Sequence, residues 1–325
     1  MVMTSQTLSH QNGMEAWLSE GYFARHETFC PRYGWLKKGF DGVLNNSHIF
    51  EEPDAIEQLG VGKNMVKAIR FWCMAFHIIG PVDTSSQRRL GGSMQSKPLG
   101  NALLSDNGWD PFLEDPASLW LLHWKLFVPP ISAIAWSLAI NLNLAHPFAL
   151  RDLSQMLVER KNRFPNLRRY SDSSIHKDAS CFIRMYASSG REDSEEIECP
   201  FTDLRLLGTD ERNAYQFRMD EKSTLPDMIF LATCFDYAFH TQPGLRSISL
   251  NKLTYEFNCP GSVFKLSETD IGHRLEKTSR AVDGVSFTES HGTRQLQFES
   301  EPESLFWQAL SKYYGSDRQA ANDSI

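Results

Sequence analysis

Four carboxylates lie within the ten-residue segment DNGWDPFLED, which spans residues 106–115. They are Asp106, Asp110, Glu114 and Asp115. Metal-dependent phosphodiester hydrolysis needs two or three carboxylates that converge on a hard cation such as Mg²⁺ or Mn²⁺. If the segment turns once, we expect all four to hold a divalent metal and Asp110 and Glu114 to be catalytic. The alternative is local: Asp115 caps a helix, and Asp106 and Asp110 hold turns.

A second set of reactive side chains lies in RHETFCPRYGWLKK, residues 25–38. His26 and Glu27 are followed here by basic residues. A histidine can act as a general base, and Arg or Lys can stabilise a pentacovalent phosphate. We therefore predict that His26 and Glu27 are catalytic. The predicted DNA contacts in this segment are Arg32, Lys37 and Lys38. The alternatives are contact with the DNA backbone or a polar group buried between helices.

Two weaker patterns complete the reactive residues. His123 lies on an otherwise apolar predicted helix, LWLLHWKLF, and is expected to be a core histidine. Asp152, Glu159 and Lys161 resemble the carboxylate and lysine set of some nucleases. Those nucleases carry the set on strands, whereas here all three residues lie on one predicted helix, so this interpretation is disfavoured.

The elements that must position these residues begin with a pair of helices between Asp54 and Phe76. A short helix ends at Gly60, and a second opens near Lys63 with apolar residues at helical spacing. The residues it is expected to bury are Met65, Ile69, Trp72, Cys73 and Phe76. The turn is not a phosphate-binding loop, because no Gly lies five residues before Gly62 and Asn64 replaces the Ser or Thr.

This arrangement predicts a helix-turn-helix, whose second helix presents its N-terminal residues to the DNA major groove. The residues that would face DNA are Lys63, Asn64, Lys67 and Arg70. Residues 97–112, with the turn signal Asn107-Gly108, are predicted to form the two-stranded wing that follows such a motif. A helical hairpin with a solvated basic side is the open alternative.

A basic and aromatic segment, RKNRFPNLRRY, provides a further predicted contact with nucleic acid. Its basic residues are Arg160, Lys161, Arg163, Arg168 and Arg169. A solvated helix end is the equally weighted alternative. Because the chain of 325 residues carries a net charge of −7, any DNA contact must come from such local patches.

The whole chain is predicted to be mainly α. We expect a flexible N-terminus (1–20), a winged helix-turn-helix-like DNA-binding domain (21–112) and a central helical region (113–190). An acidic linker (191–200) and a C-terminal α-rich domain with a small β-hairpin (201–325) follow, and this last domain is a possible second winged-helix unit. The six cysteines form no metal-binding pairs, and the longest apolar run is too broken to span a membrane. We therefore expect a cytoplasmic protein with reduced thiols.

Several stretches together resemble one bacterial family, long catalogued as a domain of unknown function, that includes SspB. They are RHETFCPRYGWLKKGFD, LGVGKNMVKAIRFW, GWDPFLEDPASLWLLHWKL, HKDASCFIRMY and CPFTDLRLL. The resemblance implies a DNA nickase that opens one strand for phosphorothioate modification in anti-phage defence. It implies as partners DNA, a cysteine desulfurase and an ATP-using sulfur-transfer enzyme. A non-catalytic DNA-binding adaptor of the same complex is the alternative.

Overall fold

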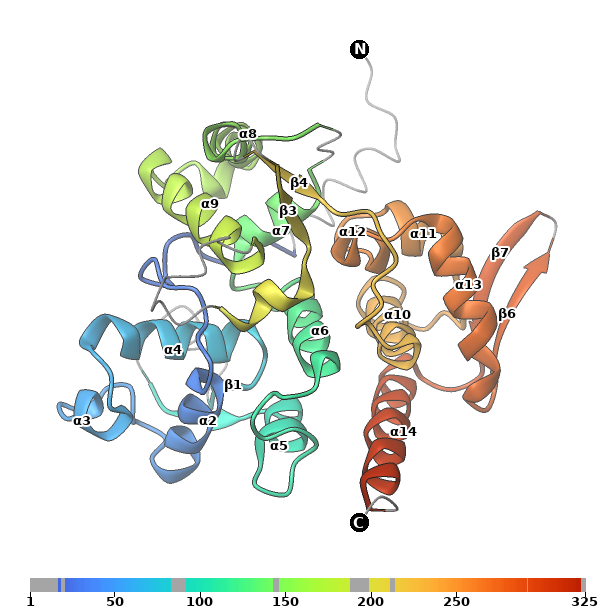
Figure 1. Ribbon diagram of the computed structural model, residues 1–325, viewed down its shortest axis with the longest axis horizontal. Coiled ribbons are helices and arrows are strands. Elements are labelled where there is room, and N and C mark those ends of the chain that lie inside the picture. Colours follow the sequence, from blue (N-terminus) through green and yellow to red (C-terminus); the bar gives the residue numbers. More distant parts are fainter. Residues whose placement is uncertain are drawn as a thin grey trace. The chain divides into compact units, whose positions relative to one another are not determined.

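The structure is a computed structural model that describes residues 17–18, 21–82, 92–142, 146–187, 199–210, 214–290 and 292–322. The side chains of residue 290 and of residues 316–322 are outside this description. The chain divides into two compact units (Figure 1). The first comprises residues 1–126 and 130–217, and the second comprises residues 127–129 and 218–325.

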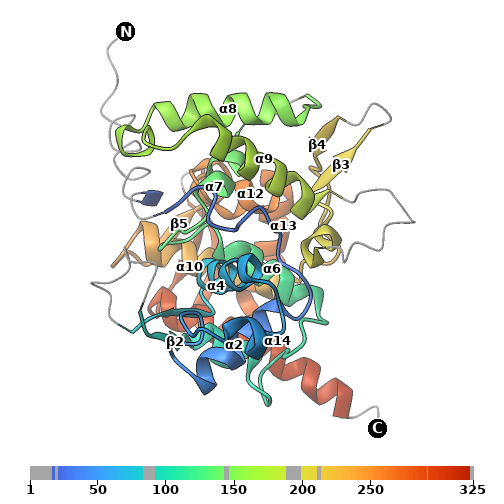
Figure 2. The same ribbon diagram turned by 90° about the vertical axis from the view of Figure 1, so that its left-hand side faces the viewer.

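In its described residues the first unit is helical, with two small two-stranded sheets, which agrees with the predicted mainly α class. Its helices are α2 (Trp35–Asn45), α3 (Ala55–Leu59), α4 (Lys63–Ala75), α5 (Pro98–Leu104), α6 (Pro116–Lys125), α7 (Ile134–Ile140), α8 (Leu150–Asn162), η2 (Pro165–Leu167), α9 (Asp172–Tyr186) and η3 (Pro200–Leu204). The helices α8 and α9 pack against each other, as the turned view of Figure 2 shows.

The predicted helical pair is confirmed. The helix α3 ends at Gly60, whose φ of 62° is left-handed, and α4 begins at Lys63. Glycine adopts this conformation without steric cost, so the chain reverses within three residues. The buried face of α4 includes Ile69, Trp72 and Cys73, as predicted, whereas Met65 is only half-buried.

The predicted wing is wrong in its position. Residues Pro98–Leu104, within the predicted wing, form the helix α5, with Pro98 in its first turn. Leu99, Leu103 and Leu104 are buried on one side of it, a helical spacing that outweighs the turn signal downstream. A two-stranded antiparallel sheet does follow α4, but its strands are β1 (Ile79–Pro81) and β2 (Met94–Ser96).

Aromatic side chains join the early and late parts of the first unit. Trp72 of α4 makes an edge contact with Trp136 of α7, and the N–H of Tyr22 donates to the carbonyl of Ser132. The predicted regions 21–112 and 113–190 therefore share one core, and their described residues lie in the first unit apart from residues 127–129. A second sheet pairs β3 (Leu207–Thr209) with β4 (Tyr215–Phe217).

The second unit surrounds α10 (Asp227–Thr241), which is buried along most of its length and packs against α13 and α14. The predicted C-terminal hairpin is confirmed as β6 (Val285–Ser290) and β7 (Thr293–Phe298), and β5 (Ser247–Ser249) extends it to three strands in the order β5-β7-β6. Its other helices are α11 (Leu250–Tyr255), α12 (Pro260–Phe264), α13 (Glu268–Thr278), η4 (Ser279–Ala281) and α14 (Pro302–Asn322).

Most of the predicted flexible N-terminus and of the acidic linker lies outside the described residues. Within the part of the chain that the structure describes, no helix is both long and apolar enough to cross a membrane.

Candidate functional site

The exposed face of α4 carries the predicted DNA-reading residues. Lys63, Asn64 and Lys67 are exposed along the first half of the helix. Arg70, further on, is half-buried and reaches Met94 of β2 with a guanidinium nitrogen at 3.8 Å from the sulfur. The structure thus keeps three of the four residues open to a large ligand and turns the fourth toward the body of the first unit.

A cavity of 290 Å³ lies beside this face, between α4 and residues 21–30, which we call the N-terminal segment. Three basic side chains and one carboxylate line it together with an aromatic and apolar wall. Its lining residues are Tyr22, Arg25, Glu27, Phe50, Val66, Lys67, Arg70, Phe71, Met74 and Ser132. This composition combines charge complementary to a phosphate with rings on which a base can stack.

One ion pair lies at the cavity. The Lys67 ammonium lies 3.3 Å from a carboxylate oxygen of Glu27, whose side chain is 31% exposed. Burial lowers the pKa of Arg70, and the nearby Glu51 carboxylate opposes that effect. Glu27 therefore lies beside basic side chains at the lining of the cavity and is partly exposed to solvent.

His26, predicted as catalytic, faces away from solvent. Only 1% of it is exposed, and the rings of Phe71, Trp72 and Trp136 surround it with centroids at 5.9, 6.0 and 5.5 Å. Its Nε2 lies 2.8 Å from Oδ1 of Asp178 on α9. Its Nδ1 is buried and has no hydrogen-bond partner among the described residues. This geometry matches the alternative of a buried polar group between helices.

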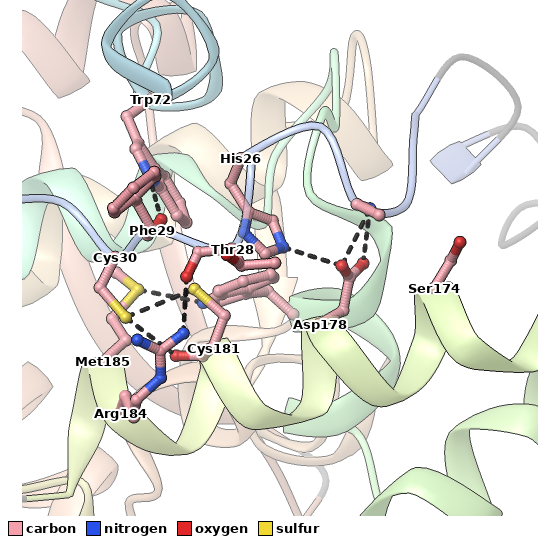
Figure 3. A network of polar contacts seen from close by, with 12 residues as sticks. His26, Thr28, Phe29, Cys30, Trp72, Ser174, Asp178, Cys181, Arg184 and Met185 are labelled. Atoms are coloured by element: carbon pink, nitrogen blue, oxygen red, sulfur yellow. Dashed lines mark hydrogen bonds and ion pairs between the residues drawn. The ribbon is translucent and has the colours of Figure 1, made fainter. Parts of the chain in front are cut away.

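Asp178 ties the N-terminal segment to α9 (Figure 3). Both of its oxygens accept from the backbone N–H of Ala24, at 2.9 and 3.1 Å, and one also contacts His26. Burial raises the pKa of Asp178, although the bond to His26 works in the opposite direction. No local pattern in the sequence marks this residue, because its partners lie more than 150 positions away in the chain.

Three of the four clustered carboxylates are engaged by other groups of the fold. Both oxygens of Asp110 accept backbone N–H groups, from Glu114 at 2.9 Å and from Asp115 at 3.0 Å. Asp115 caps α6 by accepting from the N–H of Ala117. Asp106, 94% exposed, accepts from Lys37 at 2.9 Å. Asp110 and Asp115 thus match the alternative of turn and cap residues, whereas Asp106, expected to hold a turn, pairs with a lysine 69 positions away in the chain.

These oxygens do not fit a cation site. Those of Asp110 point at backbone donors, and Asp106 is engaged by an ammonium group. Throughout the described ranges, no group of three or more His, Cys, Asp or Glu side chains could hold a metal ion. Glu114 lines a separate surface hollow together with Tyr33, Phe112 and Asp203.

The other basic residues of the first 40 positions are partly engaged within the fold. The Arg32 guanidinium lies over the rings of Phe29 and Trp35, at 5.6 and 5.5 Å. Lys37 bridges Asp41 and Asp106, and Lys38 donates to the carbonyl of Leu59 at 2.8 Å. Arg25, which was not among the predicted contacts, lines the cavity instead. The sequence signal for Arg25 was its position directly before His26.

The basic segment from residue 160 to 170 is divided between core and surface. Lys161 is buried, donates to the carbonyl of Tyr170 at 2.9 Å and pairs with Asp172 at 2.8 Å. Arg160 is half-buried. The remaining members, Arg163, Arg168 and Arg169, are exposed. These three are the members of the segment that are fully open to a ligand. His123, as expected, is a core residue, bonded to the hydroxyl of Tyr186 at 2.8 Å.

Comparison with known proteins identifies the family of this chain. The model of the family described as "Protein of unknown function (DUF4007)" matches residues 23–314. The chain belongs to this DUF4007 family. The match includes the N-terminal segment from Phe23 onward, α4 and α9, and so the helices that carry Lys67 and Asp178. No curated protein matches the chain.

Two solved structures resemble this DUF4007 chain along nearly its full length. One, described as "SspB crystal structure", is 36% identical, covers 92% of this chain and 90% of its own, and superposes with a TM-score of 0.83. The other, "Magnesium ion-bound SspB crystal structure", is also 36% identical with a TM-score of 0.83, and the coverages are 90% and 88%. The family resemblance read from the sequence is confirmed.

Proposed function

We propose that this protein is an SspB-type component of a DNA phosphorothioation system and that it binds DNA through α4 and the cavity beside it. The observation that carries the proposal is the 36% identity to SspB over about nine-tenths of both chains. The exposed Lys63, Asn64 and Lys67 supply the contact surface, at the end of α4 where a helix-turn-helix meets the major groove.

The cavity gives this binding site a second part. At 290 Å³ it is close to the lower end of the range for small-molecule sites, about 300–1,000 Å³. Such a space suits one nucleotide unit and not a duplex. The basic side chains would hold a phosphate while Tyr22, Phe50 or Phe71 packs on a base.

We propose further that the protein nicks one DNA strand at this cavity. Glu27 is the general base that takes the proton of the attacking water as the water oxygen bonds to phosphorus. The P–O bond to one sugar oxygen breaks, that oxygen leaves and takes a proton from solvent, and Arg25, Lys67 and Arg70 stabilise the charge that develops on the phosphate. His26 has no part in this step as base, because its imidazole is enclosed by aromatic rings. It holds the N-terminal segment in place through Asp178.

One SspB structure is described as magnesium ion-bound. In this chain the predicted ligands Asp106, Asp110, Glu114 and Asp115 do not fit such an ion, since their oxygens are directed to backbone and ammonium groups or lie apart. No step of the proposed reaction therefore passes through a metal at this cluster.

A non-catalytic adaptor is the second candidate. The observation that favours it is the capping role of the carboxylates, which leaves the reaction dependent on Glu27, the acid that lines the cavity. In that case the protein would bind DNA and position a cysteine desulfurase and an ATP-using sulfur-transfer enzyme, and it would leave the backbone intact.

One experiment separates the two. Supercoiled plasmid is incubated with the full chain in Mg²⁺, in Mn²⁺ and in excess chelator, and the open-circle fraction is measured beside a binding titration of the same DNA. The expected result is that the protein binds the DNA and converts supercoiled plasmid to open circles in at least one of these three conditions. Binding with fully retained supercoiling in all three conditions would establish the adaptor, and no binding at all would reject both.

A further inference from the structure

Two thiols far apart in the chain face each other at the base of the N-terminal segment. The sulfurs of Cys30 and Cys181 lie 3.4 Å apart, and the Cys30 thiol also lies 3.3 Å from the carbonyl of Cys181 (Figure 3). Cys181 belongs to the same helix, α9, that carries Asp178. The pair therefore joins the same two elements as the His26–Asp178 contact, namely the N-terminal segment and α9.

Cys30 is the accessible member of the pair. It is half-buried, whereas the other five cysteines of the chain are all buried. The hydrogen bond with the Cys181 thiol lowers the pKa of the Cys30 thiol, and the guanidinium groups of Arg184 and Arg32 lower it further. Burial raises the pKa of Cys181 well above its ordinary value. A nucleophilic thiol next to a protonated, buried one is the arrangement of an attacking and a resolving cysteine.

We propose that Cys30 and Cys181 are a redox modification site, at which a peroxide converts the two thiols to a disulfide. In the first step the Cys30 thiolate attacks one peroxide oxygen and the O–O bond breaks. The sulfur is oxidised to sulfenic acid, and the leaving hydroxide takes up the proton that the thiol released and departs as water. In the second step Cys181 attacks that sulfur, the S–O bond breaks, and a second water leaves as the S–S bond forms. Hydrogen peroxide is thus reduced to two waters while two thiols lose two electrons.

The reaction requires little movement. The sulfurs must close from 3.4 Å to the disulfide length of about 2.05 Å. The preceding chain holds Ala24, Glu27 and Thr28 at positive φ, a conformation that non-glycine residues seldom adopt. Arg184 anchors the same stretch by donating to the carbonyl of Thr28 at 2.6 Å. The disulfide would fix this stretch, with Glu27 on it, covalently to α9.

The test is a peptide map of the full chain. The protein is treated with hydrogen peroxide, quenched with catalase, alkylated and digested with trypsin without reductant. Cleavage after Arg25, Arg32, Lys177 and Arg184 yields HETFCPR and DASCFIR. The expected result is one new linked peptide that joins these two, with loss of two hydrogens, and its disappearance after dithiothreitol. Recovery of both peptides separately alkylated would overturn the proposal.

Three variants assign the roles. In Cys181→Ser the linked peptide should vanish, and dimedone should label Cys30 as a sulfenic acid. In Cys30→Ser neither the link nor dimedone labelling at Cys181 should appear. Cys199→Ser is the matched control, because Cys199 is the third thiol near Cys30, and it should keep the Cys30–Cys181 link. A link from Cys30 to Cys199, or to a second chain, would also overturn the proposal. The wild-type map alone decides if a variant does not fold.

Discussion

His26 and Asp178, separated by 152 positions in the chain, meet at 2.8 Å inside a ring of aromatic side chains. Removing one partner of a buried ionisable pair leaves the other without compensation, which costs about 3–5 kcal/mol. We therefore expect Asp178→Ala to lower the stability of the protein by about 3 kcal/mol or more. Thermal unfolding measures this loss.

The control for this variant is Lys177→Ala, which removes a charged side chain from the exposed side of the same helix and should change stability by less than about 0.5 kcal/mol. The double variant His26→Leu/Asp178→Leu should lower the stability of the protein less than Asp178→Leu alone, since it leaves neither side chain of the pair buried without the other. Equal melting temperatures for Asp178→Ala and Lys177→Ala would contradict the structural role of the pair.

Glu27 is the residue on which the nicking proposal depends. Glu27→Gln keeps the size of the side chain and removes its ability to accept a proton. Strand nicking should fall at least about a hundredfold, equivalent to about 2.7 kcal/mol of barrier. DNA affinity should stay the same or rise, because a negative charge beside Lys67 is removed. Nicking rates and affinities on the same preparation decide this, and an unchanged rate would remove Glu27 from the mechanism.

The salt dependence of DNA binding should report on α4. Lys63 and Lys67 are exposed, so Lys63→Ala/Lys67→Ala should leave two DNA phosphates without their cations and change the structure little. The slope of log K against log salt should become shallower by about 0.9 for each phosphate that the variant no longer neutralises. Lys177→Ala is again the control and should keep the parental slope. If the double variant also keeps it, α4 is not the DNA-binding face.

The clustered carboxylates allow a direct test of capping against metal binding. Asp110→Asn replaces one of the two carboxylate acceptors that hold the turn before α6, so we expect a loss of about 0.5–2 kcal/mol in stability and unchanged specific nicking activity. Glu114→Gln, at an exposed position, should change neither. A hundredfold loss of nicking at full stability, in either variant, would restore the metal interpretation.

Lys265 in the second unit predicts a pH dependence. Burial lowers the pKa of its ammonium to about 8, against about 10.4 for an unperturbed lysine. Between these values the unfolded chain holds a proton that the folded chain lacks, so stability should rise as pH increases from about 8 to about 10. Below pH 8 Lys265 is protonated in both the folded and the unfolded chain, so the full free-energy cost of burying its charge opposes folding.

Replacing this lysine isolates its effect from other groups that titrate in the same range. The melting temperature of the wild type relative to Lys265→Met should increase between pH 7 and pH 10, by an amount equivalent to at most about 3 kcal/mol. A constant difference across this range would show that Lys265 titrates normally in the folded protein.

The sequence by itself determined the features that depend on neighbours in the chain. The α3–turn–α4 unit followed from apolar spacing and a glycine that can adopt a left-handed conformation. The Asp115 cap with Pro116 behind it marked the start of α6, and alternating residues marked the β6–β7 hairpin. The motifs of the chain were also sufficient to identify the family.

Only the tertiary structure decided which of these residues share a site. The contacts of His26 with Asp178 and of Cys30 with Cys181 each close a loop of more than 150 residues, and no local pattern specifies such pairings. Residues 98–104 became α5 because three leucines are buried on one side of it, which a hairpin signal downstream could not reveal. The carboxylates of residues 106–115 are close in sequence, but the oxygens of Asp110 accept hydrogen bonds from backbone N–H groups in the turn and are not directed at a common cation. Proximity along the chain therefore predicted the helices, whereas burial and long-range hydrogen bonds determined which side chains remain available for chemistry.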